Sequence, residues 1–109
     1  MSYNQNMLQI VKTDVYAEWF VNLRDRKAKN IILARLRRVE LGNFGNSEPV
    51  GEGVTEIKIN FGPGYRIYTM RHGIEVVILL AGGDKSSQNR DIANALNMAR
   101  EMKESNSGY

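Results

Sequence analysis

Six side chains that could hold RNA gather in the second half of the sequence. They are Lys58, Arg66, Tyr68, Lys85, Gln88 and Arg90. The first three alternate with apolar residues such as Ile57 and Ile67, and this spacing places them on one face of a β-sheet, opposite the core. The other three follow the end of the next apolar segment. Because cations hold phosphates and a tyrosine ring can stack on a base, this face suits single-stranded RNA.

The same residues also have a purely structural interpretation, which the sequence leaves open. Arg66 could pair with Glu56 across neighbouring strands, while Tyr68 could fill a minor apolar cluster. A two-histidine nuclease is excluded, because His72 is the sole histidine and lies in an expected turn. The carboxylates lack metal-ligand spacing and no glycine-rich nucleotide-binding motif occurs. We therefore expect neither a metal site nor a cofactor.

A second basic cluster lies between residues 24 and 38. It holds seven of the fifteen basic residues and a single acid, Asp25, although the net charge of the chain is only +3. Arg35, Arg37 and Arg38 are expected at the edge and flanks of a helix, where they could contact RNA phosphates. The alternative is an ordinary solvated helix face, and charge alone does not decide between the two.

The elements that would position these residues follow from hydrophobic periodicity. A short strand is expected over residues 8–12. Thr13 or Asp14 can cap a helix whose buried stripe is formed by Val15, Tyr16, Trp19, Phe20 and Leu23. A second helix is expected from about residue 28 to residue 41, because Gly42 is a natural terminator. The two helices would form a hairpin with a basic tip and a basic outer side.

The second half of the chain has the pattern of a small sheet. Residues 42–53 hold four glycines and one proline, which predicts a loop. Strands are expected over 55–60, 65–70 and 74–81, with a turn at His72-Gly73 and a loop over 82–85. Ser86 or Ser87 can cap a last helix, and residues 105–109 are expected to form a mobile tail. The predicted fold is α+β, in the order β-α-α-β-β-β-α, with a small mainly antiparallel sheet covered on one face by the helix hairpin.

Size and composition favour a single domain over residues 1–109. The longest apolar run, residues 76–81, is far shorter than the roughly 20 residues needed to span a bilayer. The first six residues lack the basic start and apolar stretch of a signal peptide, and the chain has no cysteine. We therefore expect a cytoplasmic protein that does not contact a membrane.

Several motifs resemble those of a known toxin family. The most specific are the strings GPGYR at residues 62–66 and LLAGGDKSSQNRDI at residues 79–92. Together with Trp19 and the Leu23-Arg24-Asp25 segment, they extend the likeness over roughly residues 8–103. In these features the chain resembles the phage-derived, HigB-type addiction-module killer proteins of the RelE/ParE superfamily. The predicted element order is similar to that of the RelE-like fold.

The resemblance implies the toxin of a type II toxin–antitoxin system, neutralised by a cognate antitoxin that is often a helix-turn-helix protein. RelE and HigB relatives enter the ribosomal A site and cut the mRNA there, through attack of a 2′-hydroxyl on the adjacent phosphate. On this basis the chain is expected to be a ribosome-dependent endoribonuclease, an mRNA interferase that inhibits translation. Its partners would then be the antitoxin and the ribosome with its mRNA and ribosomal RNA.

The resemblance also implies roles for individual residues. Arg66 matches the arginine of the family's GYR strand and is expected to hold the scissile phosphate, while Lys85 would support the same charge or the leaving group. Lys58 lies where relatives carry lysines and would assist or act as a base, and Tyr68 would stack on the base. The basic helix hairpin would contact ribosomal RNA.

The chain departs from the family at the residues that transfer protons. Ile92 stands near the place where some RelE-like toxins carry a tyrosine, and the histidines of some HigB proteins have no counterpart. Asp91 and Gln88 are the available substitutes. Because one fold serves several functions, two alternatives stay open: a ParE-like, non-enzymatic inhibitor of DNA gyrase, and an RNA-binding module without toxicity.

Overall fold

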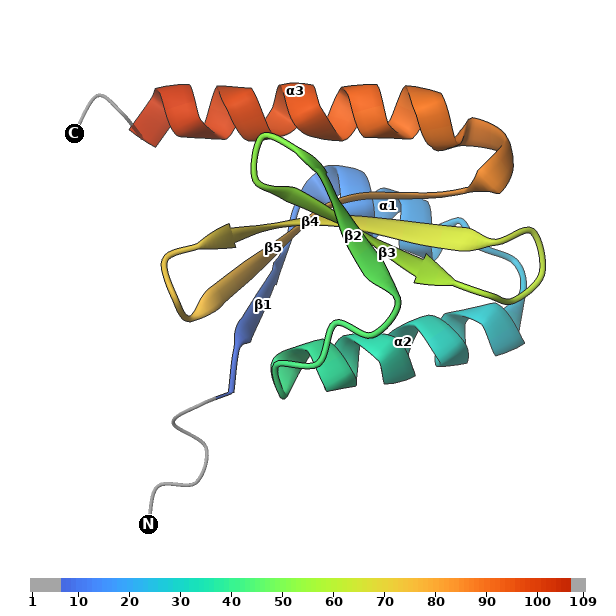
Figure 1. The fold of residues 1–109 in the computed structure, drawn as a ribbon. Coiled ribbons are helices and arrows are strands. Elements are labelled where there is room, and N and C mark those ends of the chain that lie inside the picture. Colours follow the sequence, from blue (N-terminus) through green and yellow to red (C-terminus); the bar gives the residue numbers. More distant parts are fainter. Residues whose placement is uncertain (1–6, 107–109) are drawn as a thin grey trace, which may run out of the picture.

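The computed structural model describes residues 7–106, which form three layers with a five-stranded sheet between helices (Figure 1). The elements are β1 (Gln9–Lys12), α1 (Asp14–Val21), α2 (Arg26–Glu40), β2 (Ser47–Gly51), β3 (Val54–Ile59), β4 (Tyr65–His72), β5 (Val76–Asp84), the 3-10 turn η2 (Lys85–Ser87) and α3 (Gln88–Asn106). The predicted α+β class is confirmed. Helices α1 and α2 cover one face of the sheet, and α3 crosses the other.

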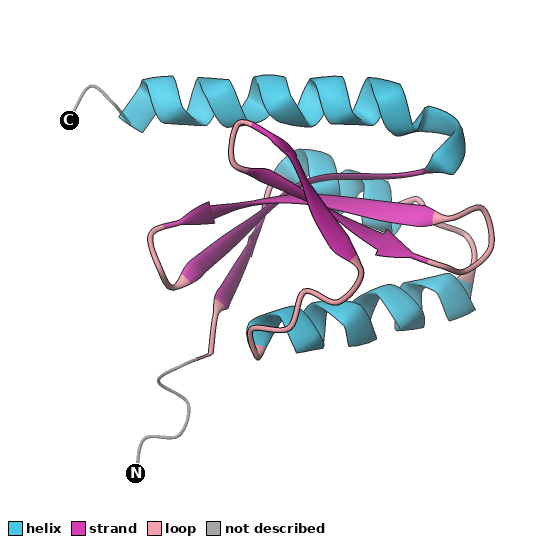
Figure 2. Cartoon of the chain, viewed as in Figure 1, coloured by secondary structure: helices cyan, strands magenta, loops and turns pink. Residues whose placement is uncertain are grey.

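The sheet has the strand order β1-β5-β4-β3-β2 and forms one continuous layer (Figure 2). Strands β2 to β5 form an antiparallel meander, whereas β1 pairs with β5 in parallel. The sheet has one strand more than predicted, because β2 lies in the segment expected to be a loop. Pro49 is tolerated in β2 because the strand is at the sheet edge. Glu52 and Gly53, both with positive φ, then make the tight turn into β3.

The two N-terminal helices pack on the sheet as the sequence predicts, except that Val15, expected in the buried stripe of α1, is 53% exposed. Their buried residues, including Tyr16 and Ile32, form one core cluster with Ile57 and Ile67 of the sheet. Thr13 caps α1, since its Oγ1 accepts a hydrogen bond from the Tyr16 N–H at 3.1 Å. The side chain of Asp25 caps α2 in the same way, so this helix begins at Arg26, two residues earlier than expected.

Helix α3 covers the sheet face that the prediction left open. Ala95 and Ala99 pack on Tyr68, Met70 and Leu80 in a second core cluster, and their small side chains let the helix lie close to the sheet. The helix continues through Ser105 and Asn106, the first two residues of the expected tail, and residues 107–109 lie outside the described part. No helix within residues 7–106 is long and apolar enough to cross a membrane.

The end of β5 is where the layers meet most closely. The loop predicted over residues 82–85 is wrong, because the strand starts at Val76 and continues through Asp84. A Cβ on Gly82 would collide with the ring of Trp19 on α1, and one on Gly83 would collide with the carboxylate of Asp91 on α3. The two glycines therefore admit a side chain from each helical layer. Asp84 caps the 3-10 turn η2 that follows, and Ser87 completes its capping box.

We expect Gly82→Ala to lower the free energy of unfolding by about 3 kcal/mol, because the added methyl group overpacks the contact with Trp19. In a Trp19→Leu background the same change should cost about 1 kcal/mol or less, since the ring is gone. Urea unfolding followed by circular dichroism of the four chains measures this coupling. Equal costs in both backgrounds would contradict the close contact.

Candidate functional site

Three of the predicted cations converge on the α3 side of the sheet. Lys58 of β3 lies directly opposite Arg66 of β4. Lys85 follows the end of β5, and its backbone N–H donates to the Pro63 carbonyl at 3.3 Å, which ties it to the loop before β4. A Cβ on Gly64 would lie 2.8 Å from Arg66 Nη1 and 3.5 Å from Lys85 Cβ, so both side chains pass close to this glycine. We call Lys58, Arg66 and Lys85 the cation row.

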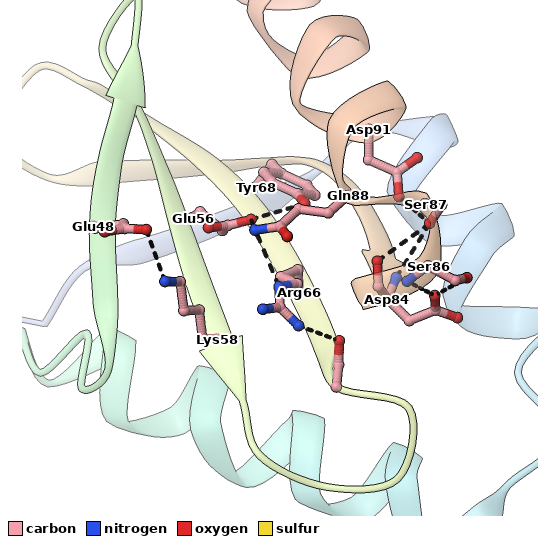
Figure 3. Close-up of polar contacts among 11 residues, drawn as sticks. Glu48, Glu56, Lys58, Arg66, Tyr68, Asp84, Ser86, Ser87, Gln88 and Asp91 are labelled. Carbon is pink, nitrogen blue, oxygen red and sulfur yellow. Dashed lines mark hydrogen bonds and ion pairs between the residues drawn. The ribbon is translucent and has the colours of Figure 1, made fainter.

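A fully buried carboxylate, that of Glu56 on β3, lies beside Arg66 (Figure 3). Its Oε2 accepts hydrogen bonds from the Tyr68 hydroxyl and from Gln88 Nε2, each at 3.0 Å, and lies 3.8 Å from Arg66 Nε. Arg66 Nη1 also donates to the Gly64 carbonyl at 2.7 Å. One carboxylate therefore connects β3, β4 and the start of α3, and it orients the arginine.

Sequence reasoning named Glu56 only as an alternative partner of Arg66, and the structure makes it the centre of the site. The available signal was an acidic residue between Thr55 and Ile57 in a strand whose neighbours are otherwise β-forming. That signal does not reveal burial, because Glu56 shares its face with the polar residues expected to face solvent. Its burial depends on α3, which packs over this face.

Tyr68 does not fit the predicted stacking role. Its side chain is 0% exposed and packs in the second core cluster with Leu80 and Ala95, so no base can reach the ring in this structure. The pKa of the Tyr68 hydroxyl is raised, mainly by burial and to a smaller extent by the hydrogen bond to Glu56. The structural interpretation that the sequence left open, an Arg66–Glu56 pair with Tyr68 in a minor cluster, is what the structure contains.

The remaining predicted residues of this side lie around the start of α3. Lys58 Nζ lies 2.7 Å from Glu48 Oε1, and this interaction lowers the pKa of the Glu48 carboxyl. Lys85, Gln88 and Arg90 line a shallow pocket of about 310 Å³. Arg90 is exposed, whereas the carboxylate of Asp91 accepts a hydrogen bond from the Ser87 hydroxyl. The proposed proton-transfer substitutes, Gln88 and Asp91, are thus both engaged in internal hydrogen bonds.

The basic residues predicted on α2 lie on the other face of the sheet, away from the cation row. Arg35 donates to the Lys58 carbonyl at 2.9 Å and to the Phe44 carbonyl at 3.1 Å, which links the helix to β3 and to the loop after α2. Arg37 and Arg38 are exposed. The structure therefore gives Arg35 a structural role and does not bring the three arginines together with Arg66.

The arrangement suits electrostatic stabilisation of a phosphate. Arg66 Nη1 donates to the Gly64 carbonyl, whereas Nε, 3.8 Å from Glu56 Oε2, and Nη2 have no hydrogen-bond partner among residues 7–106. An arginine held in this way meets an anion without first having to be ordered. Within the same residues, no group of three acidic, histidine or cysteine side chains is placed to hold a metal ion.

Comparison with known proteins finds a relative in Haemophilus influenzae, described as an uncharacterized protein. It is 41% identical over 95 residues, which cover 87% of this chain and 96% of the relative. No protein-family model matches the chain.

We expect Arg35→Ala to lower the free energy of unfolding by about 2 kcal/mol, because two backbone carbonyls lose a charged donor. The matched control is Arg38→Ala, an exposed arginine of the same helix, which should change stability by about 0.5 kcal/mol or less. Urea unfolding measures both. Equal, small effects would contradict the structural role of Arg35.

The raised pKa of Tyr68 predicts a loss of stability in alkali. In the unfolded chain a tyrosine ionises near pH 10, whereas in the folded protein this hydroxyl keeps its proton to higher pH. The contribution of the Tyr68 hydroxyl to the free energy of unfolding is therefore fully present below about pH 10. It is lost as the pH rises toward the pKa of this group in the folded protein. In Tyr68→Phe, which lacks this hydroxyl, the free energy of unfolding should therefore fall less steeply with pH, by up to about 1.4 kcal/mol per pH unit.

Unfolding of wild type and Tyr68→Phe between about pH 9 and pH 11 measures this difference, with tyrosinate absorbance as a second signal. Identical slopes for the two proteins would contradict it.

Proposed function

This chain belongs to the same protein family as its Haemophilus influenzae relative, and we propose that it is the toxin of a type II toxin–antitoxin system, a ribosome-dependent mRNA endoribonuclease. The observation that carries the proposal is the cation row on neighbouring strands, with Arg66 oriented by a buried carboxylate. The GPGYR string that contains Arg66 and the GGDKSSQ string that contains Lys85 resemble those of HigB-type toxins. The RelE-like fold is part of the same proposal.

In the proposed reaction the mRNA 2′-oxygen forms a bond to the adjacent phosphorus, and the bond from that phosphorus to the 5′-oxygen breaks. The products are a 2′,3′-cyclic phosphate and a 5′-hydroxyl: water accepts the proton of the 2′-hydroxyl as the new bond forms, and water returns a proton to the departing 5′-oxygen. Negative charge builds on the phosphorane oxygens and on the departing 5′-oxygen. Arg66 stabilises the phosphorane, and Lys85, whose side chain also starts beside Gly64, stabilises the departing oxygen.

Lys58 holds the neighbouring phosphate in this proposal. Its pairing with Glu48 fits a binding cation better than a base, because the exposed carboxylate can be displaced by a phosphate. Gln88 and Glu56 act on the substrate only through Arg66, whose guanidinium they keep in place. Tyr68, being buried, has no direct part in the reaction.

Binding to the ribosome would use the exposed cations beside the interhelical turn. Arg24, Arg26 and Lys27 are exposed there and suit contact with ribosomal RNA phosphates. The proposal places the protein in the cytoplasm, with an antitoxin and the translating ribosome as partners.

We expect Arg66→Ala to reduce mRNA cleavage about 100- to 1,000-fold, because a preorganised donor to the developing charge is removed. Arg66→Lys should restore part of the rate while keeping a positive charge beside Glu56. Primer extension on a translated mRNA, with and without ribosomes, measures the cuts. Arg71→Ala is the matched control, since this exposed arginine lies on the same strand and donates to the Ile74 carbonyl at its far end.

Absence of ribosome-dependent cuts by the wild-type chain would overturn the proposal. Inhibition of purified DNA gyrase by a chain that makes no such cuts would replace it with the non-enzymatic alternative.

A further inference from the structure

An apolar groove lies between α1, α2 and β1, on the other side of the sheet from the cation row. Its volume is about 620 Å³, and its apolar walls include Met7, Ile10, Phe20, Val21, Leu33 and Leu41. The proposed reaction uses none of these residues.

The side chains around this groove are unusually exposed for their type. Leu41 is 72% exposed, Val21 69% and Leu33 47%, and all three line the groove. Apolar side chains that gather on one concave surface mark a site where another molecule binds, whereas isolated exposed ones do not. The groove is therefore a candidate interface rather than a gap in the core.

The charges beside the groove indicate the character of its occupant. Lys12 and Arg37 line it, and neither has an ion-pair partner within residues 7–106. Lys29 adds a third cation at one end, where its Nζ donates to the carbonyl of Val21 at 3.2 Å. The carboxylate among the lining residues is that of Glu40. Positive charge thus exceeds negative charge along the rim, which favours an acidic partner.

We propose that this groove binds an amphipathic helix of a partner protein, one with large apolar residues along a single stripe and Asp or Glu on both flanks. Such a helix inserts its apolar stripe between α1 and α2 and brings its flanking carboxylates to the cations of the rim. If the proposed function holds, the partner is the antitoxin; only that identification rests on it. Arg37, which the sequence assigned to RNA, then binds a carboxylate of the partner.

Two synthetic peptides of about 15 residues, or roughly four helical turns, test the proposal. Both carry leucines along one helical stripe; one has glutamates on the flanks, and its twin has lysines at the same positions. Fluorescence anisotropy with the full-length chain gives each dissociation constant. The acidic peptide should bind at least about tenfold more tightly than its twin, and added salt should narrow the difference because it screens the charges.

Matched variants locate the binding site. Leu33→Asp and Val21→Asp should each weaken binding of the acidic peptide about tenfold or more, and Arg37→Glu should reduce the preference for glutamate over lysine. The control is Ile74→Asp, because Ile74 is 82% exposed in the turn between β4 and β5, and it should leave binding unchanged. Since all of these positions are exposed, circular dichroism should show the same fold for every variant.

Four results would overturn the proposal. The first is failure of the acidic peptide to bind, or equal binding of its twin. The second is loss of binding to a uridine oligomer in Arg37→Glu and Leu33→Asp, which would assign the groove to RNA. The third is conversion of a dimer into a monomer by Leu33→Asp, which would assign it to a second copy of this chain. The fourth is tighter peptide binding after removal of residues 1–6, which would make that segment the occupant.

The peptide assay contains no ribosome, so its result is independent of the cleavage assay. Peptide binding without A-site cuts would leave the groove assignment intact and remove the toxin proposal. Cuts in the A site without peptide binding would leave the toxin proposal intact and remove the groove assignment.

Discussion

The buried carboxylate of Glu56 is the interaction on which the cation row depends. A buried charge is costly unless neighbouring groups compensate it, and here the compensating groups come from β4 and α3. The Tyr68 hydroxyl and the Gln88 amide occupy Oε2, while Arg66 supplies positive charge nearby. Because these donors belong to separate elements, the carboxylate constrains where α3 begins as well as where the arginine points. The same contact therefore contributes to the fold and orients the site.

The end of β5 imposes a matching constraint from the backbone. Gly82 and Gly83 admit Trp19 from one layer and Asp91 from the other, and a larger residue at either position would push a helix away from the sheet. Asp84 then caps the turn that leads into α3, and Lys85 follows immediately. Gln88 can reach Glu56 only because α3 starts this close to the strand. The tight packing of the layers and the position of Lys85 beside the loop before β4 thus have one structural origin.

Hydrophobic periodicity predicted the helices and strands that bury one clear face. The alternation around Ile57 and Ile67 and the stripes of α1 and α2 each bury one clear face, and they meet in one cluster. Strand β2 was not predicted, because its segment has the composition of a loop and an edge strand needs little apolar surface. Tyr68 was misassigned because a period of two gives the face of a residue but not what covers that face. Glu56 was missed for the same reason, since α3 covers it from more than 30 residues away, as the Gln88 contact shows.

The two candidate surfaces lie on opposite sides of the sheet, and this separation limits how they can interact. A helix in the groove between α1 and α2 would not touch the cation row, so it could not neutralise Arg66 by direct contact. Its effect on the proposed ribosome-dependent activity would come from steric exclusion by the bound helix, or from a displacement of α2. Arg35 provides a physical link for the second route, because its guanidinium on α2 holds the backbone carbonyl of Lys58. Displacing α2 would therefore disturb the strand that carries both Lys58 and Glu56. Steric exclusion of the ribosome by the bound helix, in contrast, would leave α2 in place.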